Sequence, residues 1–175
     1  YRTALVETPL SLYFRDCFSS SDLDDLNIEI IRNKLYKAYL EDFANFCQSI
    51  GGPTAESMGE LLAFEADRRT INITINSFGT LLSKTERARL FPSMGKLFPG
   101  GNNALAKADE LDQVKGIVES VPEYRRLFDD NSIAGIGSAD ITFETIEDKM
   151  FEYEVERTYK YTSCILTAQS IDSLP

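Results

Sequence analysis

Apolar side chains recur at steps of three and four between residues 28 and 50, which is the spacing of one face of an α-helix. This stripe contains Ile28, Ile31, Leu35, Tyr39, Phe43, Phe46 and Ile50. Serines at 19–21, followed by acidic residues, favour a helix start, and glycines at 51 and 52 favour a helix end. The pattern therefore predicts a long amphipathic helix that reaches residue 50.

Residues 64–80, FEADRRTINITINSFGT, support two interpretations. Ile71, Ile73 and Ile75 alternate with polar residues, as in a half-buried strand. As a helix, the region carries one apolar seam and a shorter stripe on another side, so it is expected to pack on two sides. The seam contains Leu61, Phe64, Arg68, Ile71, Ile75, Phe78 and Leu82, and the stripe contains Leu62, Ala66 and Ile73. Because the alternation explains only seven residues, the sequence favours a helix that begins near Pro53.

The chain beyond residue 82 predicts shorter elements. Ser83 and Glu86 have the spacing of a capping box, which predicts a helix through about Phe91. Prolines and glycines then predict turns with little regular structure over residues 92–101. Short helices are expected over residues 103–121, NALAKADELDQVKGIVESV, with Leu111, Val114, Val118 and Val121 on one face.

Two further segments complete the predicted order of elements. Ser120 and Glu123 favour the cap of a short helix that runs through Phe128. Residues 129–140 predict a mobile loop. A final helical pattern follows, with Phe143, Ile146, Met150 and Tyr153 on one face. The fold class predicted from these patterns is all-α.

Composition narrows the class of protein. Hydrophobic residues make up 43% of the 175 positions, which is enough for one globular domain with a core. The net charge is −10, most of it in the last 75 residues, which disfavours binding to nucleic acid or to an anionic membrane surface. No apolar run approaches the roughly 20 residues of a membrane-spanning helix, so no direct span is expected.

The residue types in this sequence give little indication of a catalytic site. The chain has no histidine, which excludes a Ser-His-Asp or Cys-His nucleophile and imidazole metal ligands. Its three cysteines are widely spaced and are expected to be free thiols. The glycine-rich stretches FPGGNN and IAGIGSAD match neither a P-loop nor a dinucleotide fingerprint. We therefore predict no catalytic, cofactor-binding or metal-ligating residue.

The charged group Glu65, Asp67, Arg68 and Arg69 has a functional and a structural interpretation. The arginines suit a clamp for phosphate or carboxylate. Arg68, however, lies in the apolar seam one turn from Glu65, and a buried arginine requires a partner. The sequence favours a structural ion pair between Glu65 and Arg68, whereas Asp67 and Arg69 are expected to face solvent or to reach a neighbouring helix.

Several long stretches resemble one protein family in the same order. They are LDDLNIEIIRNKLYKAYLEDFANFC, GGPTAESMGELLAFEADRRTINITINSFGT, RARLFPSMGKLFPGG, ALAKADELDQVKGIVE and PEYRRLF. Together they resemble the subunit d family of eukaryotic V-type proton ATPases, to which the archaeal and bacterial C subunits are more distantly related. The resemblance covers residues 1–155, whereas residues 156–175 form a divergent tail.

The resemblance implies a helical bundle that forms part of a cup- or funnel-shaped subunit without a catalytic site or cofactor. It implies partners in a hetero-oligomeric complex, namely the c-ring and the central-stalk subunits D and F, at the cytosolic face of an endomembrane. The implied role is to couple the stalk to the ring during ATP-driven proton transport. Family members are about twice as long, so roughly their N-terminal half is absent, and a start at Tyr1 suggests a fragment or a processed chain.

Two other functions stay open from the residues alone. A stand-alone helical adaptor derived from the family would bind a different partner. An enzyme that holds an anionic substrate would need Arg68 exposed in a pocket beside a second converging charge. Both alternatives depend on where the charged residues of 65–69 lie in the fold.

Overall fold

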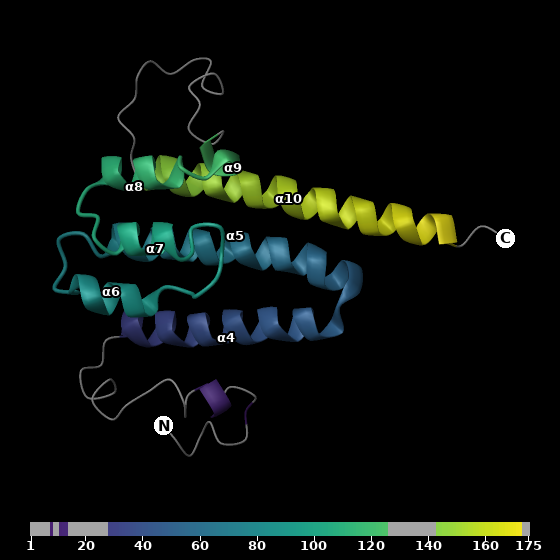
Figure 1. Ribbon diagram of the computed structural model, residues 1–175, viewed down its shortest axis with the longest axis horizontal. Coiled ribbons are helices and arrows are strands. Elements are labelled where there is room, and N and C mark those ends of the chain that lie inside the picture. Colours follow the sequence, from purple (N-terminus) through teal and green to yellow (C-terminus); the bar gives the residue numbers. More distant parts are fainter. Residues whose placement is uncertain (1–7, 9–10, 14–27, 126–142, 173–175) are drawn as a thin grey trace.

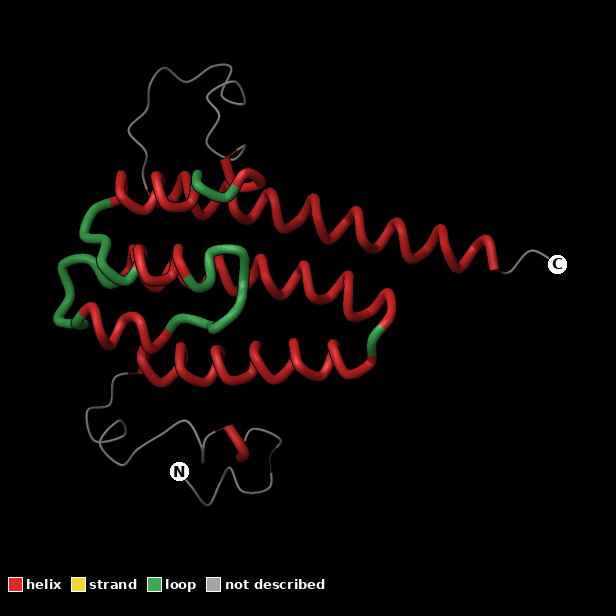
Figure 2. The backbone as a smooth tube through the Cα atoms, viewed as in Figure 1, coloured by secondary structure: helices red, strands yellow, loops and turns green. Residues whose placement is uncertain are grey.

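The computed structural model describes residue 8 and residues 11–13, 28–125 and 143–172. The described part of the chain contains helices, turns and loops and no strand, which confirms the predicted all-α class (Figure 2). The labelled helices are α4 (Ile28–Ile50), α5 (Gly52–Asn76), α6 (Lys84–Leu90), α7 (Gly100–Leu105), α8 (Leu111–Val118), α9 (Pro122–Arg125) and α10 (Phe143–Asp172).

Helix α5 is the central element of the bundle. Figure 1 shows α4 on one side of it and α10 on the other, and both helices contact α5. The shorter helices α6, α7 and α8 contact the same central helix. Beyond the end of the other helices, α10 continues alone toward the C-terminus (Figure 1).

The predicted helix that reaches residue 50 is confirmed as α4. The serines at 19–21, where its start is predicted, lie outside the described residues. Gly51 and Gly52 have φ angles of 73° and 58°, the left-handed region that favours glycine. These two residues therefore reverse the chain directly from α4 into α5.

The helical interpretation of residues 64–76 is confirmed, and the strand interpretation is wrong. Leu62 and Ala66 face α4, where they pack with its Leu40 and Cys47. Other α5 residues join a larger core with residues of α6, α7, α8, α9 and α10; they are Phe64, Ile71, Ile73 and Ile75. The helix is therefore packed on two sides, as its pattern predicts, although Ile73 belongs to the larger core and not to the α4 side.

The predicted seam extends further than the helix. Helix α5 ends at Asn76, so Phe78 and Leu82 lie beyond it, although both still pack against the larger core. Ser77 donates its hydroxyl to the Thr74 carbonyl, and Gly79 takes a φ angle of 70°. The chain turns because glycine adopts this conformation without steric cost.

Helix α6 begins with the predicted capping box. The Ser83 hydroxyl accepts a hydrogen bond from the Glu86 amide, and the Glu86 carboxylate accepts one from the Ser83 amide. The predicted absence of regular structure over 92–101 is wrong at its end, because α7 begins at Gly100. Arg87 of α6 is buried and donates to the carbonyls of Leu105, Ala106 and Ala108, and these bonds satisfy the C-terminal end of α7.

The last helices follow their predicted apolar faces. Val114 and Val118 of α8 are fully buried. Helix α9 is described from Pro122 to Arg125, and the predicted continuation to 128 and the predicted loop at 129–140 lie outside the described residues. Three α10 residues of the predicted face are buried in the larger core, namely Ile146, Met150 and Tyr153.

Candidate functional site

Asp67, in the second half of α5, is fully buried and binds two segments that follow it in the chain. Its Oδ2 accepts a hydrogen bond of 2.8 Å from the Lys96 amide and one of 2.6 Å from the Tyr124 hydroxyl. Its Oδ1 accepts a bond of 3.1 Å from the Leu97 amide. One carboxylate thus attaches the 92–99 segment and α9 to the central helix.

Gly95 allows the 92–99 segment to pass this carboxylate. Its φ angle is 105°, in the region that side chains rarely adopt. A Cβ atom at this position would lie 2.2 Å from Oδ1 of Asp67 and 3.1 Å from the carbonyl oxygen of Ala63. The geometry of the buried carboxylate therefore requires glycine here.

The electrostatics of this group follow from burial. Burial raises the pKa of Asp67 above the ordinary aspartate value, although hydrogen bonds from Tyr124 and from the Leu97 and Lys96 amides act in the opposite direction. Burial and the adjacent carboxylate also raise the pKa of Tyr124, so its hydroxyl stays protonated as a donor. The result is a buried carboxylate whose oxygens are occupied by three hydrogen-bond donors.

Glu65, one turn from Arg68, is the centre of a second polar group. Arg68 donates from Nε to Glu65 Oε2 at 2.8 Å, and its Nη2 forms an ion pair with the same oxygen at 2.6 Å. Its Nε also lies 3.6 Å from Glu154 of α10. Tyr36 of α4 donates its hydroxyl to the other oxygen of Glu65. The Arg69 guanidinium lies 3.9 Å from the centre of the Tyr36 ring.

This second group joins three long helices. Glu65 and its two arginines belong to α5, Tyr36 to α4 and Glu154 to α10. Two carboxylates already accompany the Arg68 guanidinium, which disfavours a clamp for an anionic substrate. Of the two alternatives for Arg69, the structure shows a contact with a neighbouring helix, and Asp67 likewise reaches α9 and is not exposed.

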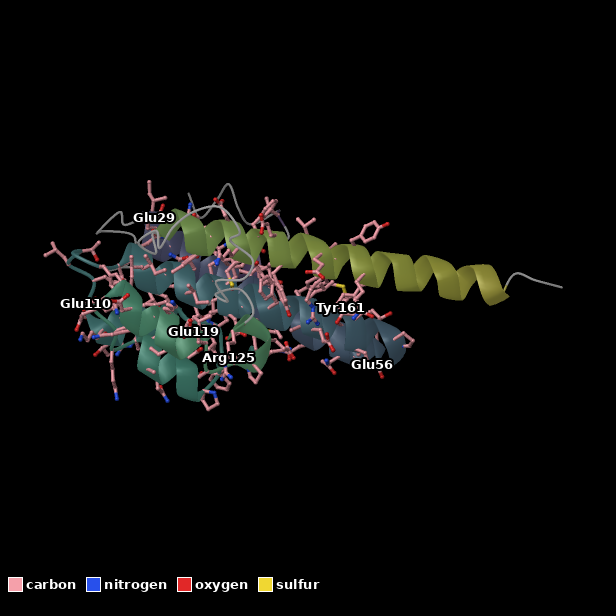
Figure 3. All side chains as sticks on the ribbon, turned by 90° about the horizontal axis from the view of Figure 1, so that it is seen from above. Glu29, Glu56, Glu110, Glu119, Arg125 and Tyr161 are labelled. Atoms are coloured by element: carbon pink, nitrogen blue, oxygen red, sulfur yellow. The ribbon has the colours of Figure 1, made fainter. Side chains whose placement is uncertain are left out.

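Arg157 of α10 forms the third polar group. Its guanidinium donates to Glu60 of α5 and to the Tyr161 hydroxyl, and it lies 3.9 Å from Glu123 of α9. Tyr161 also donates to Glu60, and in Figure 3 it lies between α10 and α5. Glu123 in turn pairs with Lys96. This group connects α10 and α9 to the same central helix.

A cleft of about 750 Å³ opens between α4, α5, α6 and α10. Two pairs of its polar side chains bind each other, because Arg32 pairs with Glu29 and Asn72 donates to Glu147. The cleft also carries apolar residues, among them Ile30, Leu82 and Leu90. Its side chains do not converge on one charged or nucleophilic centre, so we assign no ligand to it.

The described residues offer neither a cluster of metal ligands nor a membrane-spanning helix. Among them, no group of three or more histidine, cysteine or acidic residues could hold a metal ion. None of their helices combines the length and apolar character of a membrane span. The second glycine-rich stretch, IAGIGSAD, falls within 133–140 and lies outside the described residues.

Comparison with known proteins identifies the family. Residues 1–163 match the family model described as ATP synthase (C/AC39) subunit. The chain belongs to the ATP synthase (C/AC39) subunit family. The matched residues make up most of the chain. Together with the relatives described next, the match confirms the resemblance to subunit d of V-type ATPases.

Individual relatives of this ATP synthase (C/AC39) family member are named as subunit d of V-type proton ATPases. It is 50% identical to V-type proton ATPase subunit d2 of Arabidopsis thaliana over 161 residues, which are 92% of this chain and 46% of the relative. It is 52% identical to V-type proton ATPase subunit d of Dictyostelium discoideum, over 89% of this chain and 42% of the relative. The subunit d of Saccharomyces cerevisiae is 43% identical over the same shares. The chain thus spans just under half the length of these relatives.

Sequence reasoning missed the main role of Asp67 in this family member. Its acceptor oxygens bind backbone amides and a hydroxyl that lie 29 to 57 residues further along the chain. Charge spacing gives no signal for such partners, because no basic side chain is involved. The available signal was positional, since an aspartate adjacent to the apolar seam of a two-sided helix points toward a core.

Proposed function

We propose that this chain is a non-catalytic subunit of the V-type proton ATPase membrane sector that couples the central stalk to the c-ring rotor during ATP-driven proton transport. The observation that carries the proposal is the family match over residues 1–163. Relatives named V-type proton ATPase subunit d, at up to 52% identity among those compared above, support it. The proposed site of action is the cytosolic face of a vacuolar or other endomembrane.

A part that transmits torque needs stiffness more than it needs chemistry. Close-packed helices resist deformation because their side chains interdigitate with few voids. The central helix α5 is packed against α4 on one side and against α10 on the other. The proposed coupling role therefore rests on a bundle whose long helices move as one body.

In the proposed function, the polar groups between the helices add to the stiffness of the bundle. Directional hydrogen bonds and ion pairs add to this packing, because each of them fixes the relative position of the two helices that it joins. Glu65 and Arg68 link α5 to α4 and α10 through Tyr36 and Glu154. We assign the pair the role of a structural stiffener.

The proposed partners are the c-ring and the stalk subunits D and F in a hetero-oligomeric complex. The acidic character of the last 75 residues supports a polar contact with a partner that carries basic residues. The finding that no described helix suits a membrane span agrees with attachment through other subunits. No nucleic acid is expected as a partner.

The proposal is tested by affinity purification of this chain from detergent-solubilised membranes that contain V-type ATPase, with partners identified by mass spectrometry. We expect ring and stalk subunits to be recovered together. The matched control is the Asp67→Ala variant, whose weakened fold is expected to reduce recovery of both. Circular dichroism of each chain establishes that it is helical before the comparison.

Two outcomes would contradict the coupling role. A folded chain that recovers neither ring nor stalk subunits would show that this form does not enter the complex. Reproducible recovery of an unrelated protein in their place would favour the alternative of a stand-alone helical adaptor.

A further inference from the structure

Helix α10 carries a second apolar face that no described residue covers. Phe151, Val155 and Tyr159 follow one another at steps of four and are 60%, 52% and 76% exposed. On a helix of 3.6 residues per turn, Val155 lies opposite the buried face that carries Ile146, Met150 and Tyr153. The first face packs in the core, and the second points away from the bundle.

Helix α5 shows what such a pattern means in this fold. It also has apolar residues on two sides, and both sides are covered, one by α4 and the other by the larger core. A helix that is apolar on two sides is normally packed on two sides. Contiguous exposed apolar side chains on a helix mark an interaction surface, whereas isolated ones need no explanation.

The lengths of the relatives indicate what covers α10. The match spans 46% of the Arabidopsis relative and 42% of the Dictyostelium relative, so each contains more chain outside the matched region than inside it. That additional chain belongs to the same proteins and is available to pack beside the matched part. A stripe three side chains long suits one packed helix.

The charges beside the stripe restrict the partner further. Glu152 and Glu156 are exposed along one edge of the three apolar residues. A helix that packs here with basic side chains at the matching edge gains electrostatic complementarity in addition to the buried apolar area. A second copy of this chain would bring the same acidic edge, so its binding would lack this electrostatic complementarity.

We propose that Phe151, Val155 and Tyr159 form a docking face for a helix that corresponds to the part of the subunit d relatives outside the matched region. This inference rests on the family membership and not on the proposed coupling role. The docked helix has an apolar stripe and a basic edge. It covers α10 on the side opposite α5.

The first experiment measures binding directly. The full chain, labelled with a fluorophore, is titrated with the polypeptide of Arabidopsis subunit d2 that lies outside the matched 161 residues. The double variant Phe151→Asp/Val155→Asp is expected to bind at least about tenfold more weakly, because two charges are buried without partners. The control Glu156→Ala, on the edge of the face, is expected to stay within about threefold.

The second experiment does not depend on the folding of that separate polypeptide. A photo-reactive phenylalanine analogue replaces Val155, or the exposed Asp112 of α8 as the control, in a chimera whose matched region comes from this chain. Mass spectrometry then locates the cross-links. Cross-links from position 155 to segments outside the matched region support the proposal.

The other outcomes overturn it. Cross-links from position 155 to a second copy, to another ATPase subunit, or only within the matched region identify a different occupant. Absence of cross-links at position 155, while the chimera is folded by circular dichroism, shows that the face stays open. Concentration-dependent dimers of the unmodified chain that the double variant abolishes also contradict the proposed occupant.

Discussion

Two carboxylates that lie two residues apart on α5 are held by different kinds of partner. Glu65 is partly exposed and lies among two arginines and a tyrosine, so its partners are charged or polar side chains. Asp67 is fully buried and its partners are two backbone amides and one hydroxyl. We therefore expect the more conspicuous charge cluster to contribute less to stability, because the Arg68 side chain is 30% exposed to solvent whereas Asp67 is fully buried.

The largest effect is expected from Asp67→Ala. The substitution leaves the buried Leu97 amide, the part-buried Lys96 amide and the Tyr124 hydroxyl without their acceptor. Each unsatisfied group costs about 1–3 kcal/mol, so the free energy of unfolding is expected to fall by roughly 4 kcal/mol. Urea unfolding followed by circular dichroism measures the change, with the exposed Asp112→Ala as control. A loss below about 1 kcal/mol would show that the buried carboxylate contributes no more than a surface residue.

Gly95→Ala is expected to have the next largest effect. The new methyl group would lie 2.2 Å from the Asp67 carboxylate, on a backbone with φ of 105°. Strain and displacement of the carboxylate are expected to lower the free energy of unfolding by about 2–3 kcal/mol. Gly116→Ala in α8, where a Cβ meets nothing within 4 Å, is the control and should stabilise by about 0.5–1 kcal/mol. Equal effects of the two substitutions would contradict the close approach at Gly95.

Arg68→Met tests the exposed side of the comparison. It removes the bonds to Glu65 and the contact with Glu154 but keeps the aliphatic part of the side chain, so the expected loss is about 1 kcal/mol. Arg32→Met is the matched control, because Arg32 pairs with Glu29 at i−3 where both side chains are more than 60% exposed. Its expected effect is below about 0.5 kcal/mol. Chemical denaturation measures the free energy of unfolding of both variants. A larger loss for Arg32→Met than for Arg68→Met would contradict the expected order.

The smallest expected effect is on how the free energy of unfolding depends on pH, and it concerns Asp67 alone. Burial raises the folded-state pKa of Asp67 above its unfolded value. The associated stabilisation is therefore complete below the unfolded pKa, about 3.9, and is lost as the pH rises through the folded pKa. The difference in unfolding free energy between the wild type and Asp67→Asn should shrink as the pH rises from about 3.5 to 7. A difference that grows over this range would mean that the hydrogen bonds outweigh burial.

The sequence contained enough information for the long helices and for the contact between neighbouring residues. Apolar spacing predicted α4 and the two-sided α5, because each period is repeated over many residues. The separation of three residues between Glu65 and Arg68 indicated a partner for the arginine within one turn.

The rest of the site depends on contacts that spacing does not encode. Asp67 meets Tyr124 only because the 92–99 segment and α9 fold back onto α5. The start of helix α7 at Gly100 was missed because prolines and glycines occupy this part of the chain, while the C-terminal end of the helix is satisfied by Arg87 from another helix. Tertiary contacts decided both features, and local sequence preferences did not.

The direct reversal of the chain at Gly51 and Gly52 has a consequence for the order of folding. Helices α4 and α5 adjoin in sequence, so their contacts close short loops and form at little cost in chain entropy. Asp67 loses its water only when residues 96, 97 and 124 arrive, and its contact with Tyr124 joins residues 57 positions apart. We therefore expect the hairpin of α4 and α5 to form early in folding and Asp67 to be buried late. Loss of its hydrogen bonds accelerates unfolding far more than it slows folding.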